Sequence, residues 1–179
     1  MKKISVLTFL LIIWGTNLKA QVFISSNIMY CSPYGENQVD EYGGGFNLLF
    51  GYSLNNKLDV SAKIERCYFA SFVDHSRIST IGINIKYFPL NKSFQPYLGF
   101  GVGFVERYLD IEIMGDIFKD YENIISVEPE IGIRFDSKWI EGLYINTGLS
   151  YNMIDSNNKM NLINLKIGLQ YYFKKLDKK

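Results

Sequence analysis

The residue types best suited to nucleophilic chemistry occur together once, at Asp74, His75 and Ser76, and His75 is the only histidine of the chain. A catalytic base must reach its nucleophile through space, whereas adjacent side chains on an extended chain point apart. Nothing else in the sequence completes a triad around this tripeptide. We therefore expect His75 to be a polar loop residue, and we expect no catalytic residues and no cofactor.

A group of acidic residues is the second candidate, because carboxylates bind hard cations. These residues are Asp110, Glu112, Asp116, Asp120 and Glu122. Their spacing is too irregular for a twelve-residue calcium loop, which also requires glycine at its sixth position and glutamate at its twelfth. One histidine and two separated cysteines do not supply a zinc ligand set. A solvated acidic loop is the expected structure here, with a cation site as the alternative and no metal site predicted.

The two cysteines, Cys31 and Cys67, allow a disulfide if the chain is exported. The strand pattern described below places them two strands apart, which corresponds to about 10 Å. A disulfide requires Cα atoms within about 7 Å, so only a folded-over loop would close it. Two free thiols are expected, and the disulfide stays open as the alternative.

A glycine-rich stretch, "QPYLGFGVGF" from Gln95 to Phe104, raises the possibility of phosphate binding. A dinucleotide-binding turn needs G-x-G-x-x-G followed by a helix, and this stretch reads G-x-G-x-G with no helical period after it. Strict alternation has the period of a strand, with all the glycines on one face. The stretch is therefore expected to form part of a β-sheet wall.

The N-terminal segment 1–20 has two lysines, an apolar run from Ile4 to Trp14 and a short polar stretch that ends at Ala20. This is the layout of a cleaved secretory signal peptide, and the run is too short for a spanning helix, which needs about 20 residues. Residues 21–179 are then one domain. Without Lys2, Lys3 and Lys19, 16 of the 19 basic residues remain against 18 acidic ones. This negative balance argues against nucleic acid as a partner.

Alternating apolar and polar residues recur along the whole of segment 21–179 and predict strands. The expected strands are Val22–Tyr30, Gly43–Tyr52, Leu58–Phe69, Arg77–Phe88, Gln95–Tyr108, Asn123–Asp136, Leu143–Tyr151 and Met160–Phe173. The connections alternate between longer segments (31–42, 70–76, 109–120 and 152–159) and mostly shorter turns. An even number of strands with long loops at one end is typical of a transmembrane barrel with both termini on the periplasmic side.

Sorting the strands by parity gives one face that is almost free of charge. The other face carries mainly Asn, Ser, Thr, Gln and Gly. A water-facing strand surface would be rich in Lys and Glu, so these small polar groups favour a crowded interior and an apolar face toward lipid. Aromatic residues gather at both strand ends, which is typical of membrane-interface girdles. They are Tyr52, Tyr87, Phe88, Tyr97, Phe135, Tyr171, Tyr172 and Phe173 at the turn end, and Tyr30, Tyr68, Phe69, Tyr108 and Tyr151 at the loop end. A soluble binding barrel is the alternative.

Eight charged residues fall on the polar face and form the candidate site, a lumen charge network. They are Asp59, Lys63, Glu65, Lys86, Glu128, Glu130, Arg134 and Lys166. Counting along the strands places Asp59, Lys86 and Arg134 toward the periplasmic end and the other five near mid-height. An eight-stranded barrel has an interior just wide enough to be filled by side chains. A balanced plug of ion pairs is therefore expected, with an ion path as the alternative.

The sequence resembles the small outer-membrane β-barrel proteins of Gram-negative bacteria, the OmpA/OmpX/OmpW-like and porin-like barrels. The resemblance rests on "YFPLNKSFQPYLGFGVGF" (87–104), "VEPEIGIRF" (127–135) and the closing strand "LKIGLQYYF" (165–173). It implies an all-β, eight-stranded, antiparallel up-and-down barrel in the outer membrane. It also implies contact with membrane lipid and with the barrel-assembly machinery. Leu169, Tyr171 and Phe173 resemble the last-strand signal that this machinery recognises in the family. Pro129 cannot donate to a sheet ladder, so a bulge or a missing hydrogen bond is expected there.

The expected function is that of a non-enzymatic outer-membrane scaffold whose external loops meet an unidentified partner. Three alternatives stay open: a narrow pore or small-molecule conduit, an enzyme acting on lipid A, and a soluble periplasmic binding barrel.

Overall fold

The computed structural model describes residues 21–34, 42–55, 57–70, 74–90, 92–113, 116–154 and 161–173. The expected signal peptide, segment 1–20, and most of the first and last expected loops lie outside these residues. No helix among the described residues is long and apolar enough to cross a membrane.

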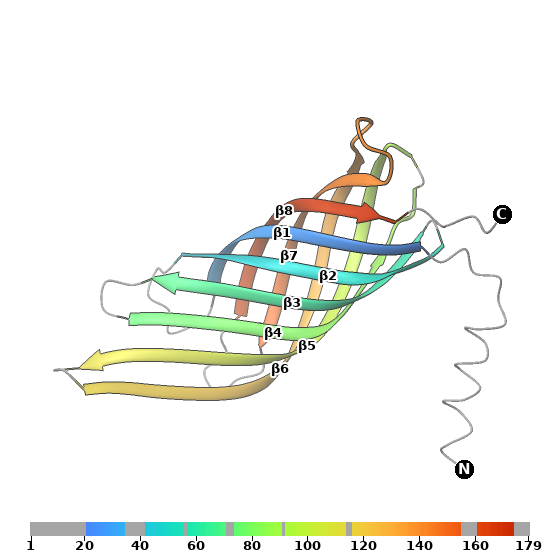
Figure 1. Ribbon diagram of the computed structural model, residues 1–179. Coiled ribbons are helices and arrows are strands. Elements are labelled where there is room, and N and C mark those ends of the chain that lie inside the picture. Colours follow the sequence, from blue (N-terminus) through green and yellow to red (C-terminus); the bar gives the residue numbers. More distant parts are fainter. Residues whose placement is uncertain are drawn as a thin grey trace, which may run out of the picture.

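Eight strands close into one barrel, and each strand pairs antiparallel with its neighbours in sequence (Figure 1). The strands are β1 (Gln21–Tyr34), β2 (Gly43–Asn55), β3 (Leu58–Ala70), β4 (Asp74–Tyr87), β5 (Phe94–Ile113), β6 (Asp116–Asp136), β7 (Leu143–Ile154) and β8 (Asn161–Tyr172). Pairing of Phe23 with Tyr172 joins β1 to β8 and completes the cylinder. The expected eight-stranded up-and-down barrel is confirmed.

Two expected loops are wrong, because strand pairing continues through them. β5 and β6 pair as far as Ile113 with Asp116, so most of segment 109–120 is a hairpin that extends beyond its neighbours (Figure 1). Leu109, Ile111 and Ile113 maintain the two-residue period here, and the acidic residues between them hid this pattern. β4 begins at Asp74, so His75 lies in a strand, opposite Ala70 and Asp110, and was wrongly placed in a loop.

The two faces of the wall follow the alternation predicted from the sequence. On β4, Ile83 is 60% exposed while its neighbour Asn84 is 1% exposed. Leu98, Phe100, Val102 and Phe104 of β5 are all exposed, and Gly101 and Gly103 are buried between them. The glycines therefore face the lumen, and the outer surface is a belt of large apolar side chains that only a hydrocarbon solvent would cover without penalty.

The aromatic girdles are only partly as expected. Tyr52, Tyr87, Phe135 and Phe173 are exposed at the turn end, and Tyr30 and Tyr68 are exposed at the loop end. By contrast, Phe88, Tyr97, Tyr172 and Phe69 were wrongly assigned to the girdles and are buried. Adjacent aromatic residues on a strand point to opposite faces, so one of each pair must fill the lumen.

The loop end of the lumen is apolar, which the sequence did not predict. Met29, Cys31, Cys67, Phe69, Ile78, Val105, Ile124, Ile154 and Leu162 form this interior cluster. Cys31 and Cys67 are free thiols here, and both belong to this buried cluster. Gly43 and Gly45 of the intervening strand β2 pair with Cys31 and Cys67 respectively. The two side chains therefore share one interior cluster, which their separation by two strands did not suggest.

Pro129 interrupts the ladder between β6 and β7. Val127 pairs with Met153 and Glu130 pairs with Ser150, but no pairing joins Glu128 or Pro129 to the described residues of β7. Two residues lie between the flanking pairs on each strand, so the register is unchanged and there is no bulge in this part of the wall. Of the two expected outcomes, the missing hydrogen bond is the one found.

We expect the cost of a charged substitution on the outer wall to depend on depth in the bilayer. Ile83→Lys places an ammonium near the midplane and should lower the free energy of unfolding by about 2–4 kcal/mol. Tyr87→Lys, four residues along the same strand at the turn end, should cost about 0–1 kcal/mol because its side chain reaches the interface. Urea unfolding of both variants in lipid vesicles measures the difference. Equal costs would contradict a bilayer around this belt.

Candidate functional site

The structure buries all eight residues of the lumen charge network. They come from four strands: Asp59, Lys63 and Glu65 from β3, Lys86 from β4, Glu128, Glu130 and Arg134 from β6, and Lys166 from β8. Each lies at an inward position of its strand, and four acidic residues face four basic ones. Two groups of contacts form, one at mid-height and one at the turn end.

Glu128 is the centre of the mid-height group. One carboxylate oxygen accepts a hydrogen bond from Lys63, and the other accepts from Lys166 Nζ at 2.5 Å. Ser150 Oγ of β7 donates to the same carboxylate at 2.6 Å. This last bond joins β6 to β7 through side chains at the place where their backbone pairing lapses.

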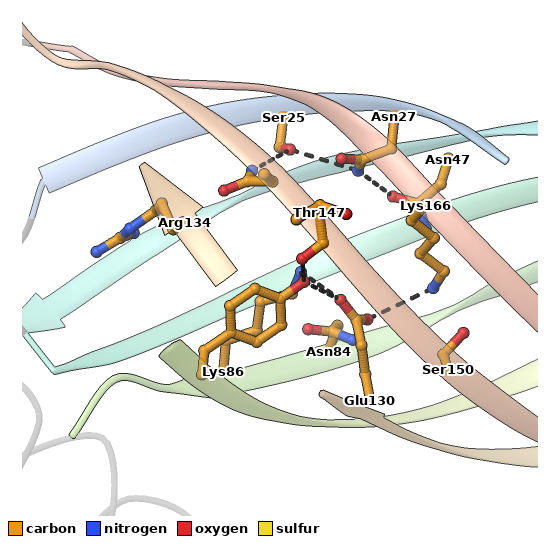
Figure 2. A network of polar contacts seen from close by, with 12 residues as sticks. Ser25, Asn27, Asn47, Asn84, Lys86, Glu130, Arg134, Thr147, Ser150 and Lys166 are labelled. Carbon is orange, nitrogen blue, oxygen red and sulfur yellow. Dashed lines mark hydrogen bonds and ion pairs between the residues drawn. The ribbon is translucent and has the colours of Figure 1, made fainter. Parts of the chain in front are cut away.

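Glu130 lies on the other side of Pro129 and is held by a different set of groups. Lys86 Nζ approaches Oε1 at 2.7 Å, Tyr97 Oη donates to the same atom at 2.6 Å, and Lys166 lies 3.4 Å from Oε2. Figure 2 shows Lys86 and Lys166 reaching Glu130 from two sides of the lumen. A Cβ at Gly132 would lie 2.5 Å from Tyr97 Oη, so glycine is required for the ring to reach this position.

Glu65 completes the mid-height group. Lys166 Nζ lies 3.3 Å and Lys63 Nζ 3.7 Å from its carboxylate. Asn47 donates to Glu65 at 3.0 Å, and Asn27 donates to Asn47 at 3.0 Å, so an amide relay carries the network across β2 to β1. Lysine and carboxylate partners therefore span the lumen, with Lys166 contacting three carboxylates.

The turn-end group is built around Arg134. Its guanidinium lies 3.1 Å from Asp59 Oδ2, and its Nε donates to Gln95 Oε1 at 2.9 Å. It stacks on Phe88, with 3.7 Å from Cζ to the ring centroid, and also contacts the ring of Tyr172. Tyr172 Oη donates to Asp59 at 2.5 Å. A planar cation between aromatic rings, paired with a carboxylate, closes this end of the lumen.

The position of Lys86 differs from the one expected. Sequence counting grouped it with Asp59 and Arg134, whereas its ammonium joins the mid-height group through Glu130 and Tyr97. A lysine side chain is long enough to reach along the lumen, so the height of its Cα does not fix the height of its charge.

Several residues of the site were missed by sequence reasoning, namely Tyr97, Tyr172, Phe88 and Gln95, whereas Gln170 was expected on the polar inner face. Gln170 donates to Asp59 at 3.0 Å and to Tyr172 at 2.7 Å. The available signal was parity: Tyr97 and Gln95 share the inward face with Gly99 and Gly101. The position of Tyr97 near a strand end instead suggested an interfacial role.

Some buried polar groups have no partner within the described protein. These groups include both side-chain amide atoms of Asn152 and Asn164, together with Ser126 Oγ. They lie on the loop side of the mid-height group, next to the apolar cluster. Buried groups of this kind bind ordered water when the space allows it.

The other candidates from the sequence do not join this site. The backbone of His75 lies opposite Ala70 and Asp110 in the outer parts of β4 and β5, and its side chain is outside the described residues. The side chains of Asp110, Glu112, Asp116, Asp120 and Glu122 are likewise outside them. Among the described side chains, no group of three or more His, Cys, Asp or Glu residues is arranged to hold a metal ion.

We expect removal of Glu128 to destabilise the barrel strongly. Glu128→Leu leaves Lys63 with only Glu65 at 3.7 Å, and breaking a buried ion pair costs about 3–5 kcal/mol. The double variant Glu128→Leu with Lys63→Met should recover part of this loss, because both charges are then gone. Glu106→Leu, at an exposed position of β5, is the control and should change stability by about 0.5 kcal/mol or less. Urea unfolding in vesicles measures all three, and a single variant as stable as the control would refute the paired plug.

Comparison with known proteins agrees with this architecture. No protein-family model and no curated protein sequence matches the chain. Among solved structures, Neisserial surface protein A is similar with a TM-score of 0.72 and 16% identity, over 86% of this chain and 99% of that one. Ail of Yersinia pestis, solved with the heparin analogue sucrose octasulfate, has a TM-score of 0.62 and 17% identity over 86% and 99%. A major outer membrane protein from Thermus thermophilus has a TM-score of 0.59 and 11% identity over 87% and 100%. The expected outer-membrane location agrees with these neighbours, and the chain has the fold of the small bacterial outer-membrane β-barrel proteins.

Proposed function

We propose that this protein is a non-enzymatic, integral outer-membrane scaffold, whose closed barrel holds external segments at the cell surface. The observation that carries the proposal is the complete pairing of the eight lumen charges. Each of the four carboxylates has a cationic partner within 4 Å across the lumen. These ion pairs occupy the space that a conduit would need.

The turn end supports the same conclusion. Arg134 contacts the rings of Phe88 and Tyr172, and all three residues are buried. A channel lined by hydrated charges needs a water-filled path beside them. Arg134 instead lies between aromatic rings and the carboxylate of Asp59. Passage of an ion through this end would therefore require these contacts to break.

The other end of the barrel carries the proposed binding role. The β5–β6 hairpin extends beyond its neighbours and would stand clear of a bilayer that covers the apolar belt (Figure 1). Five acidic residues lie between Asp110 and Glu122, with Lys119 as the only basic residue in that segment. A polyanionic sugar of the kind bound to Ail would be repelled here, so we expect a neutral or cationic partner.

We also propose that β8 is the strand presented to the barrel-assembly machinery. Leu169 and Phe173 are exposed on its outer face, and Tyr171 between them is partly exposed. An alternating apolar and aromatic edge at the last strand is available before β8 pairs with β1. This arrangement supports the role inferred for these residues from the sequence.

The scaffold proposal predicts no steady ion conductance. Purified protein reconstituted in a planar bilayer should show no ohmic current, because paired side chains fill the lumen. The variant with Arg134→Ala and Phe88→Ala removes only the turn-end closure and should also show no current, because the mid-height ion pairs still span the lumen. Steady conductance of the wild type, with stability unaffected by Glu128→Leu, would establish the pore function instead.

The proposal also predicts that His75 has no catalytic role. His75→Ala should leave the acyl composition of lipid A unchanged in cells that express the variant, as measured by mass spectrometry. Expression of the unmodified protein is the comparison. An acyl group gained or lost with the unmodified protein, and not with His75→Ala, would replace the scaffold by a lipid A enzyme.

A further inference from the structure

A groove opens in the outer wall of the barrel around Pro129, at the junction of β5, β6, β7 and β8. Its volume is about 420 Å³, within the roughly 300–1,000 Å³ typical of small-molecule sites. The lining is almost entirely apolar, and its main members are Leu98, Pro129, Ile131, Leu149, Tyr151 and Ile163. We call this feature the Pro129 groove.

The groove has a local cause in the sequence. Proline has no N–H to donate, and the pairs that would join Glu128 and Pro129 to β7 are missing. Apart from a register shift between Ser53 and Asn55 at the turn end of β2, the rest of the described wall is a continuous ladder whose outward side chains stand beside one another. At Pro129 the compact ring replaces a longer side chain and the two strands are not bonded, so the surface is recessed there.

The open side of the groove faces the membrane. Leu98 and Ile131 at its edges are 60% and 57% exposed. Pro129 lies between Ile125 and Phe135, two exposed apolar residues of the same strand, and therefore within the apolar belt. A hydrocarbon chain is the surrounding molecule that fits an apolar recess at this depth.

Polar groups at the inner side of the groove are already engaged. Glu130 is bonded to Lys86 and Tyr97, and Ser150 is bonded to Glu128. The groove therefore offers no free charge to a lipid headgroup, and recognition must rest on the hydrocarbon part.

We propose that the Pro129 groove is a binding site for one acyl chain of a membrane lipid. A chain in the recess contacts protein on several sides, whereas a chain against the convex wall contacts it on one side, so dispersion contacts favour the recess. The site is distinct from the lumen network and from the external segments. It requires only that the barrel lies in a bilayer.

The test uses the unmodified protein in vesicles of phosphatidylethanolamine and phosphatidylglycerol. A small fraction of the phosphatidylethanolamine carries a photoactivatable diazirine near the middle of one acyl chain. After irradiation, peptide mass spectrometry maps the adducts. Leu98, Leu149 and Ile163 should be labelled about fourfold more than Leu48 and Ile64, the ratio given by about 0.8 kcal/mol for one additional buried methylene group.

Leu48 and Ile64 are matched controls because they form a register pair on β2 and β3, on the opposite side of the barrel. Their exposed fractions, 41% and 50%, bracket the 46% of Leu149. Labelling that follows exposure evenly around the barrel would overturn the groove and leave the membrane location intact. No labelling at any belt residue would overturn both.

A pair of variants tests the shape of the groove directly. Leu149→Trp fills the recess and should reduce labelling at Leu98 and Ile163 to the level of the control residues. Leu48→Trp makes the same change on the opposite wall and should leave groove labelling unchanged. A gel shift between unheated and heated samples verifies that each variant is folded, and Ile163→Phe replaces Leu149→Trp if it is not. Cross-links between two protein copies at Leu98 or Ile163, in place of lipid adducts, would make the groove a protein contact and overturn the proposal.

Discussion

The constraint on which the structure depends is that a chain in hydrocarbon must satisfy its backbone hydrogen bonds internally. Eight strands meet this requirement by closing on themselves, with β1 paired to β8. Closure at this strand number leaves a lumen only as wide as its side chains. The small polar residues, the glycines and the buried ion pairs are consequences of that width.

A narrow lumen determines how charges can be kept inside. An isolated charge would be poorly hydrated there, so each must find a partner from another strand. Lys166 contacts Glu65, Glu128 and Glu130 at once, and Arg134 combines a carboxylate with an aromatic stack. Such networks link distant strands, since Lys63 and Glu128 lie 65 residues apart in sequence.

The fold and the residues of the lumen charge network could be predicted from the sequence, because each residue of a strand faces one of only two sides. Ile83 and Asn84 could not both face lipid, and Lys63 could not share a face with Ile64. The alternation pattern does not predict how far a side chain reaches along the lumen or which rotamer it adopts. Lys86 was therefore placed too close to the turn end. Cys31 and Cys67 were not expected to share one interior cluster, because the approach of two side chains across the lumen depends on several strands together. Segment 109–120 was misread because its acidic composition was given more weight than its period.

Pro129 connects the wall with the network. The residue breaks the β6–β7 ladder in the part of the barrel where unpaired backbone is least tolerated, and its two neighbours along the chain are Glu128 and Glu130. Ser150 of β7 bonds Glu128, while Lys63, Lys86 and Lys166 hold both carboxylates from β3, β4 and β8. These side-chain contacts hold β6 from the lumen side at the position where its backbone is not paired with β7. The lumen network therefore holds β6 in place where its pairing with β7 is interrupted, and the same interruption opens the groove on the lipid side. A barrel that used its lumen for transport would have to loosen these contacts, and this requirement supports the proposal that the interior serves as part of the wall.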